Sequence, residues 1–233
     1  MINKEKINKQ FSQYANEYNN HNIIQQIVSK ALVREITNQP KKILELGCGS
    51  GQIFKNINFN YNYYKAIDFS ASMCNIHPTA KNLDVLCLDF DDESFIKNIE
   101  NENYDMVISS SALQWSKDLN KIISTLSKIS SNINMALFTS NTFKTIFELT
   151  DTNSPILDEQ YIKTIFSKYY NCIFEIINYK LEFNNKKKMF EYIKKSGVSG
   201  ETNKLSFKKA KYLYKNYPFN YLEFEVIFIK GGK

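Results

Sequence analysis

Three glycines at alternate positions, Gly47, Gly49 and Gly51, form the stretch of this sequence best suited to holding a ligand. They follow the apolar run from Ile43 to Leu46, which is typical of the end of a buried strand. Because glycine has no side chain, a turn with glycine at every second position lets a bound molecule approach the backbone closely. We therefore expect a ligand to lie against this turn.

Carboxylates and hydroxyls stand where the next predicted strands end. Asp68 closes the second strand and Asp89 the third, while Ser109 and Ser110 close the fourth. In an open parallel sheet, ligands bind outside the carboxyl ends of the strands, where the strand order reverses. Asp68 lies about twenty residues past Gly47, the offset at which an acid holds the two hydroxyls of a ribose. The pattern predicts a cofactor that contains adenosine.

The glycine spacing narrows the class of cofactor. A dinucleotide turn reads G-x-G-x-x-G, whereas this turn reads G-x-G-x-G, and Glu45 precedes its first glycine by two residues. The run E-L-G-C-G-S-G resembles motif I of the Rossmann-like S-adenosylmethionine-dependent methyltransferases. That resemblance implies that the turn backbone passes under the amino acid part of the cofactor, Asp68 holds the ribose and Asp89 meets the adenine amine. The cofactor site it implies, with no metal, consists of Glu45, Gly47, Cys48, Gly49, Gly51, Asp68, Phe69, Met73, Asp89, Phe90, Ser109 and Ser110.

Alternating strand and helix patterns must position these residues. Strands are predicted at 41–47, 63–68, 83–89, 104–110 and 133–140. Helices are predicted at 22–36, 52–57, 72–76, 94–99 and 119–129, with a looser helical pattern at 7–18. Five apolar strands separated by helices predict an α/β fold with a doubly wound, mostly parallel sheet.

The order changes after Ser140. Helices are predicted at 142–149 and 159–169, then a strand at 172–183, two lysine-rich helices at 186–195 and 207–216, and a last strand at 221–230. The last two strands could form a sheet edge, with the two helices inserted between them. We expect one methyltransferase domain over 1–233, made of an N-terminal helical lid (1–40), a cofactor-binding core (42–140) and C-terminal strands with a helical insertion (141–233).

Composition excludes some classes of function. The chain has 233 residues, a formal net charge of +6 and 30 basic residues, of which Arg34 is the only arginine. Lysine provides few of the bidentate contacts that recognise bases and phosphates, so nucleic-acid binding ranks low. The four cysteines have no metal-ligand spacing. Because the N-terminus is polar and no apolar run approaches about 20 residues, we expect a cytoplasmic protein.

Segments outside the cofactor motif resemble a narrower family. The runs FSQYANEYNNHNIIQQIVSKAL, SSSALQWSKDL, FEYIKKSGVSG and YPFNYLEFEVIF are similar to the malonyl-[acyl-carrier protein] O-methyltransferases of biotin synthesis. The resemblance implies methylation of the free carboxylate of malonyl-acyl carrier protein, which would be the partner and substrate. A carboxylate is already ionised at pH 7, so no general base is needed. We accordingly assign no catalytic side chain.

The same resemblance implies substrate-binding roles for Tyr14, Tyr18, Gln114 and Trp115. Tyr14 and Tyr18 lie one helical turn apart and share a face, which suits either a lid or packing against the sheet. Trp115 could either pack in the hydrophobic core or contact the substrate. Glu225 departs from the family, because many relatives carry a basic residue at this place in the last strand.

Some alternatives stay open. The lysines of 186–195 and 207–216 suit a solvated helix face or a docking face for an acidic carrier protein, with Lys208, Lys209 and Lys211 as the docking candidates. The enzyme could instead methylate a free small acid such as trans-aconitate. A third reading is a cofactor-binding regulator or nucleic-acid-binding protein without turnover.

Overall fold

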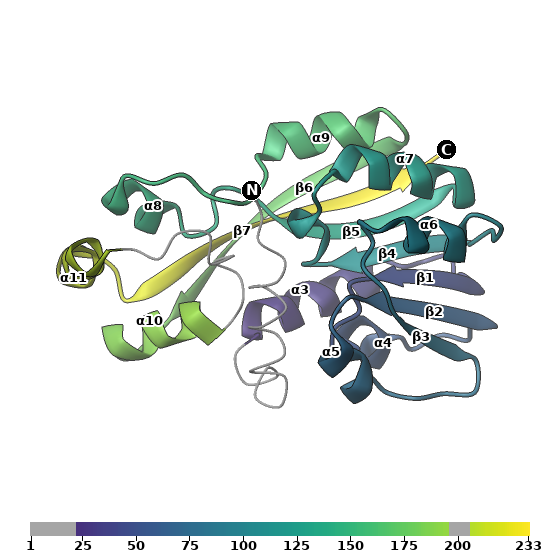
Figure 1. Ribbon diagram of the computed structural model, residues 1–233, viewed down its shortest axis with the longest axis horizontal. Helices are drawn as coiled ribbons and strands as arrows, with labels where there is room; N and C mark the ends of the chain where they lie inside the picture. Colours follow the sequence, from purple (N-terminus) through teal and green to yellow (C-terminus); the bar gives the residue numbers. More distant parts are fainter. Residues whose placement is uncertain (1–21, 196–205) are drawn as a thin grey trace.

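The computed structural model describes residues 22–195 and 206–233, which form a seven-stranded sheet in the order β3-β2-β1-β4-β5-β7-β6 (Figure 1). The strands are β1 (Lys42–Leu46), β2 (Tyr63–Asp68), β3 (Leu83–Cys87), β4 (Met106–Ser110), β5 (Asn132–Phe138), β6 (Asn171–Glu182) and β7 (Tyr221–Gly232). β7 pairs antiparallel with β5 and β6, and the other pairs are parallel. The predicted doubly wound, mostly parallel sheet is confirmed.

Helices cover both faces of the sheet. One face carries α6 (Glu93–Ile99), α7 (Leu119–Ile129) and α9 (Glu159–Ser167), and the other carries α3 (Ile23–Arg34) and α4 (Gln52–Asn56) (Figure 1). The other helical elements are α5 (Ala71–Ile76), η1 (Leu113–Trp115), α8 (Lys144–Thr150), α10 (Lys186–Lys195) and α11 (Phe207–Asn216). None of the helices in the described ranges is long and apolar enough to cross a bilayer.

Alternation along the strands divides the core into two layers. Successive side chains of a strand point to opposite faces, so Leu44 and Leu46 pack in the layer of α7 and α9 while Ile43 packs in the layer of α3. In β5, Met135 joins the first layer and Phe138 the second. The side chain of Glu45 therefore lies on the α3 face of the sheet.

The β6–β7 pair is longer than the parallel strands. β7 pairs with β6 from Tyr221 onward, but it pairs with β5 only from Val226. The segment Tyr221–Glu225 therefore extends past the carboxyl end of β5. Helices α8, α10 and α11 lie at this extended end of the molecule (Figure 1). The sheet edge with two inserted helices is thus as predicted.

Some predicted bounds differ from those in the structure by one or two residues. β3 ends at Cys87, which pairs with Asp68, because β2 ends there and offers no further partner. Asp89 therefore lies in the following loop and not in the strand. The helix α3 ends at Arg34, earlier than expected, and the short turn η1 was not predicted.

Gly231 lies in β7 where there is no room for a side chain. A Cβ atom there would lie 2.7 Å from Ile133 Cγ1 and 3.1 Å from Tyr170 Cβ, whereas one at the neighbouring Gly232 would meet no atom within 4 Å. We expect Gly231→Ala to lower the free energy of unfolding by about 1 to 3 kcal/mol through overpacking. Gly232→Ala should change it by less than about 0.5 kcal/mol. Equal urea midpoints for the two variants would contradict this packing.

Candidate functional site

A cavity lies at the carboxyl ends of β1, β2 and β4, where the strand order reverses between β1 and β4. This is the expected ligand position in a doubly wound sheet. The cavity is lined by Asn22, Gln25, Ser29, Glu45, Gly47, Cys48, Gly49, Ser50, Gln52, Ile53, Asp68, Phe69, Met73, Phe90, Ser110, Ser111, Ala112 and Trp115.

The three glycines of the turn all have left-handed φ angles, of 69° at Gly47, 51° at Gly49 and 79° at Gly51. A Cβ atom at Gly47 would lie 2.1 Å from Ala112 Cβ, so this glycine lets the loop after β4 pack against the turn. One at Gly51 would lie 2.6 Å from Pro78 Cδ. One at Gly49 would meet nothing within 4 Å, which leaves open space on the cavity side. Gly51 starts α4 and does not line the cavity.

Asp68 fixes the turn from the end of β2. Its Oδ2 accepts a hydrogen bond from the Gly49 amide at 2.8 Å, and its Oδ1 accepts one from the Ser70 amide at 2.9 Å. Burial raises the pKa of Asp68 to about 6, although these backbone donors lower it in part. The carboxyl group thus joins the glycine turn to the loop that leads into α5, and it borders the cavity.

Glu45 lies under the turn and is 1% exposed. The Tyr64 hydroxyl donates to Glu45 Oε2 at 2.5 Å. Burial raises the pKa of Glu45 to about 8, an effect that the Tyr64 hydrogen bond reduces and that the nearby Asp68 carboxyl increases. Glu45 is therefore mostly protonated at neutral pH in the absence of a cationic ligand.

The end of β4 turns its serines in different directions. Ser109 Oγ donates to the Leu46 carbonyl at 2.8 Å and does not line the cavity. Ser110 and Ser111 do line it. Gln114 lies behind Ser111, with its Nε2 donating to the Ser111 carbonyl at 2.7 Å, and is not among the lining residues. Trp115 is 5% exposed and lines the cavity.

Most of the predicted cofactor residues meet at this cavity. Those that line it are Glu45, Gly47, Cys48, Gly49, Asp68, Phe69, Met73, Phe90 and Ser110, together with Trp115 from the predicted substrate set. Asp89 does not line it, and its Oδ1 accepts from the Asp91 amide within the loop after β3. Tyr14 and Tyr18, the predicted lid tyrosines, lie outside the described residues.

Sequence reasoning missed the contribution of α3. Asn22, Gln25 and Ser29 line the cavity and are 0%, 7% and 1% exposed. They are spaced by three and four residues, so they share one side of the helix. In the sequence, the available signal was the spacing of these three polar residues beside the apolar stripe of the helix. Their burial is visible only in the structure.

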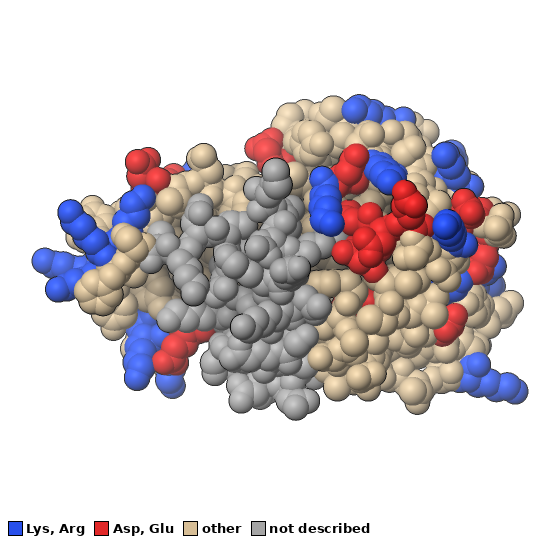
Figure 2. All heavy atoms as spheres, in the orientation of Figure 1, with Lys and Arg blue, Asp and Glu red and all other residues tan. Residues whose placement is uncertain are grey.

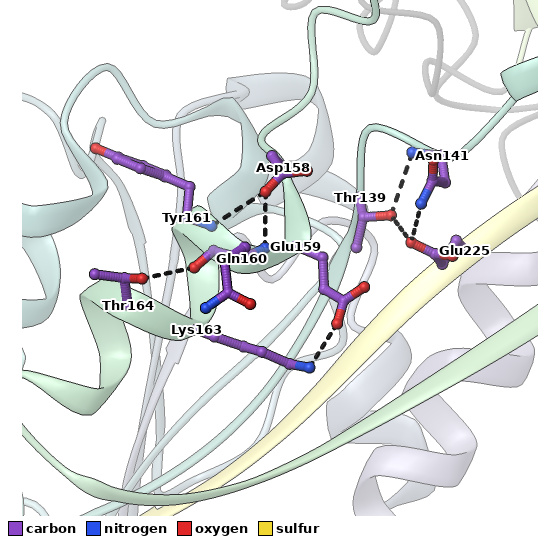
Figure 3. Close-up of polar contacts among 9 residues, drawn as sticks. All are labelled: Thr139, Asn141, Asp158, Glu159, Gln160, Tyr161, Lys163, Thr164 and Glu225. Carbon is purple, nitrogen blue, oxygen red and sulfur yellow. Dashed lines mark hydrogen bonds and ion pairs between the residues drawn. The ribbon is translucent and has the colours of Figure 1, made fainter.

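Glu225, which departs from the pattern of the family that the sequence resembles, has partners within the described structure. Its Oε1 accepts from Thr139 Oγ1 at 2.5 Å and from Asn141 Nδ2 at 2.9 Å, beyond the end of β5 (Figure 3). Its main chain also pairs with Thr142 Oγ1. Glu225 does not line the cavity, and its carboxylate ties β7 to the loop after β5.

The chain is similar in sequence to known methyltransferases. Residues 44–132 match the model of a family described as a methyltransferase domain. A malonyl-[acyl-carrier protein] O-methyltransferase of Buchnera aphidicola subsp. Baizongia pistaciae is 30% identical over 246 residues, covering 94% of this chain and 93% of the relative. The Bacillus anthracis protein of the same name is 31% identical and covers 54% of this chain and 49% of its own. The biotin biosynthesis bifunctional protein BioHC of Saccharophagus degradans is 26% identical, over 63% of this chain and 26% of its own.

Solved structures agree on the fold. The YcgJ protein of Bacillus subtilis matches with a TM-score of 0.64 at 11% identity, covering 88% of this chain and 97% of its own. A putative methyltransferase of Bacillus halodurans matches with a TM-score of 0.60 at 10% identity, covering 88% and 98%. At such low identity these likenesses show a shared fold alone.

The raised pKa of Glu45 predicts how stability changes with pH. The folded protein keeps a proton on Glu45 that the unfolded chain, with the ordinary value of 4.5, has already released. The free energy of unfolding should therefore fall as pH rises from 6 to 8, by at most about 1.4 kcal/mol per pH unit. Asp68, with a pKa of about 6, contributes mainly below this range.

Glu45→Gln should flatten that fall, because an amide does not titrate and can still accept from Tyr64. Urea unfolding of the protein without cofactor at pH 6, 7 and 8 measures the difference. Glu100→Gln, which changes an exposed side chain, should keep the wild-type slope. Identical slopes for Glu45→Gln and wild type would show that Glu45 does not carry this proton.

Proposed function

The chain belongs to the malonyl-[acyl-carrier protein] O-methyltransferase family, and we propose that it methylates the free carboxylate of malonyl-acyl carrier protein in biotin synthesis. It is a methyltransferase whose cofactor is S-adenosylmethionine, which supplies a methyl group activated on a cationic sulfonium. The observation that carries the substrate proposal is the 30% identity over 94% of the chain to a relative of that name.

The cavity fits this cofactor. The open space in front of Gly49 leaves room for a ligand against the turn backbone. A carboxylate offers about four lone-pair sites, so Asp68 can accept from further donors beside the backbone amides of Gly49 and Ser70, and we assign it to the ribose hydroxyls. Phe69, Met73 and Phe90 offer apolar surface for the adenine ring. Two carboxyl groups near the turn favour a ligand that carries positive charge.

The chain has little proton chemistry to do in this reaction. The acceptor carboxylate is already ionised at pH 7, so the residues around it need only orient one oxygen and exclude water. The buried Trp115 side chain, 5% exposed, lines the cavity and suits the exclusion of water. We keep it as a proposed substrate contact.

Asp68→Asn tests the cofactor assignment. The amide keeps the size of the side chain but removes a charged acceptor, which weakens hydrogen bonds by about 1.5 to 3 kcal/mol. We expect S-adenosylmethionine to bind about 10- to 100-fold more weakly by isothermal titration calorimetry. Asp105→Asn is the matched control, because Asp105 also accepts from two backbone amides, those of Lys41 and Lys42, at the opposite edge of the sheet. Equal affinities for Asp68→Asn and the control would refute the assignment.

The lysines of α11 form a candidate docking face for the carrier protein. Lys208, Lys211 and Lys215 are exposed and share one side of the helix. Figure 2 shows lysine side chains gathered at the left end of the molecule, where α10 and α11 lie in Figure 1. The carboxyl end of β5 faces this end of the molecule. An acidic carrier protein would meet complementary charge there.

Two other lysines have structural partners, which changes the set expected from the sequence. Lys209 Nζ donates to the Thr150 carbonyl at 2.6 Å and holds α11 against α8. Lys186 Nζ donates to the Tyr217 carbonyl at 2.7 Å. A charge reversal at Lys209 would disturb this packing, so Lys208, Lys211 and Lys215 are the better test set.

Reversing Lys208, Lys211 and Lys215 to glutamate should raise the KM for malonyl-carrier protein, more at low salt than at high salt. Solvated charges act on association, and each contributes only about 0.2 to 1 kcal/mol. The kcat and the activity on a short malonyl thioester should be nearly unchanged. The same charge change at Lys97, Lys121 and Lys128, exposed on α6 and α7, is the control. Equal losses on both substrates, or equal effects of the two triple variants, would exclude docking on α11.

Transfer of a radiolabelled methyl group to malonyl-carrier protein, malonyl-CoA and trans-aconitate tests the proposed function itself. We expect malonyl-carrier protein to be the best acceptor and the gene to restore growth without biotin in a strain lacking this step. Preference for trans-aconitate would favour an enzyme for free acids. Cofactor binding without transfer to any acceptor would favour a regulator.

A further inference from the structure

Two serine hydroxyls at the end of β4 lack a hydrogen-bond partner in the part of the chain that the structure describes. Ser110 and Ser111 both line the cavity, and the Oγ atom of each is buried without a partner within the described ranges. Buried polar atoms in native proteins are nearly always satisfied, so each exception needs an explanation. A ligand in the cavity that accepts hydrogen bonds would satisfy both.

The backbone places the two hydroxyls on the same side. Ser111 has a φ of 57°, in the left-handed region that serine rarely adopts. This angle interrupts the alternation of the strand, so that Ser111 joins Ser110 at the cavity. Strained residues of this kind persist when surrounding structure holds them, and they cluster at functional sites.

Two hydrogen bonds hold Ser111 in this conformation. Its amide donates to the Ala136 carbonyl at 2.8 Å, which continues the pairing of β4 with β5. Its carbonyl accepts from Gln114 Nε2 at 2.7 Å. Gln114 is 1% exposed and packed behind the loop. The backbone of Ser111 is therefore held in this conformation in the protein without ligand.

The charges around the cavity show what the hydroxyls can receive. Among the described lining residues, the ionisable side chains include Glu45 and Asp68 but no lysine or arginine. An acceptor carboxylate finds no fixed cation in this part of the wall. The donors that the wall offers at the β4 end are neutral and include the hydroxyls of Ser110 and Ser111, one strand away from Asp68 across β1.

We propose that the hydroxyls of Ser110 and Ser111 donate hydrogen bonds to the carboxylate of the substrate and orient it for methylation, with Gln114 as a positioning residue for Ser111. This inference rests on the proposed function, and it assigns Ser110 to the substrate instead of to the cofactor set expected from the sequence. The carboxylate oxygen forms a bond to the methyl carbon while the carbon–sulfur bond breaks, and the electron pair of that bond goes to sulfur. The products are a neutral ester and a neutral thioether. No proton moves, and both serines keep theirs.

Neutral donors suit this reaction better than a cation. The carboxylate loses its charge as the new bond forms, so an arginine or lysine would stabilise the starting carboxylate more than the transition state. A neutral hydroxyl orients the oxygen, and it stabilises the starting carboxylate over the transition state by less than a cation would. The specificity for a carboxylate then comes from the positions of the two hydroxyls together with the positive charge of the cofactor.

The test uses Ser110→Ala, Ser111→Ala and the double variant with malonyl-carrier protein and S-adenosylmethionine. We expect the double variant to raise the KM for malonyl-carrier protein or lower kcat so that kcat/KM falls about 10- to 100-fold. The Kd for S-adenosylmethionine by calorimetry and the Tm should stay close to wild type. Ser111→Gly, which tolerates the φ of 57°, removes the same hydroxyl if Ser111→Ala folds poorly. Ser116→Ala is the matched control, because Ser116 Oγ is also buried without a partner among the described residues but Ser116 does not line the cavity.

A binding measurement separates recognition from turnover. With S-adenosylhomocysteine bound, the wild-type protein should bind malonyl-carrier protein more tightly than acetyl-carrier protein, which lacks the carboxylate. The double variant should lose most of that preference. An unchanged preference, or a loss of S-adenosylmethionine affinity as large as the loss of kcat/KM, would overturn the proposal. Failure of the proposed function would differ, because wild-type protein would then not methylate malonyl-carrier protein at all.

Discussion

The buried carboxyl group of Asp68 is the interaction on which the geometry of the cavity depends. One oxygen accepts from Gly49 and the other from Ser70, so a single side chain joins the turn after β1 to the loop after β2. The turn contains three left-handed glycines and has little preference for one shape by itself. Because Asp68 is held at the end of a paired strand, it transfers the rigidity of the sheet to that turn. The cavity between them is thus preformed.

The local pattern of the sequence predicted the elements well, because strands and helices with one or two buried faces carry a clear period in their apolar residues. The core positions Ile24, Val28 and Leu32 of α3 follow from that period and are all buried. Ser29 is equally buried, at 1% exposure, but a reading that follows the apolar stripe treats it as a surface residue. The end of β3 was missed for a similar reason. Asp89 continues the pattern of the strand, whereas pairing with β2 stops at Cys87.

Contacts between distant residues could not be predicted from any local pattern. Lys208 and Lys209 are adjacent and identical in type, yet only the second was found to donate to a carbonyl 59 residues away, that of Thr150. Glu225 likewise accepts from Thr139, 86 residues earlier in the chain. Which lysine is available to a partner, and which acid has a structural task, is decided by the packing of α8, α11 and β7. From the sequence alone, residues of the same type, such as Lys208 and Lys209, cannot be told apart in this respect.

The charges of the cavity also bear on the exchange of cofactor and product. Methyl transfer converts a cationic sulfonium into a neutral thioether, and the carboxyl groups of Glu45 and Asp68 both line the cavity. Ionised carboxyl groups in a buried site attract the cationic form far more than the neutral one. Their pKa values of about 8 and about 6 in the free protein mean that a cation also stabilises their ionised state, which couples cofactor binding to the release of protons. If the cofactor binds beside Glu45 and Asp68 as proposed, the same carboxyl groups favour the cationic cofactor over its neutral product, and a lysine or arginine in this part of the wall would oppose that preference.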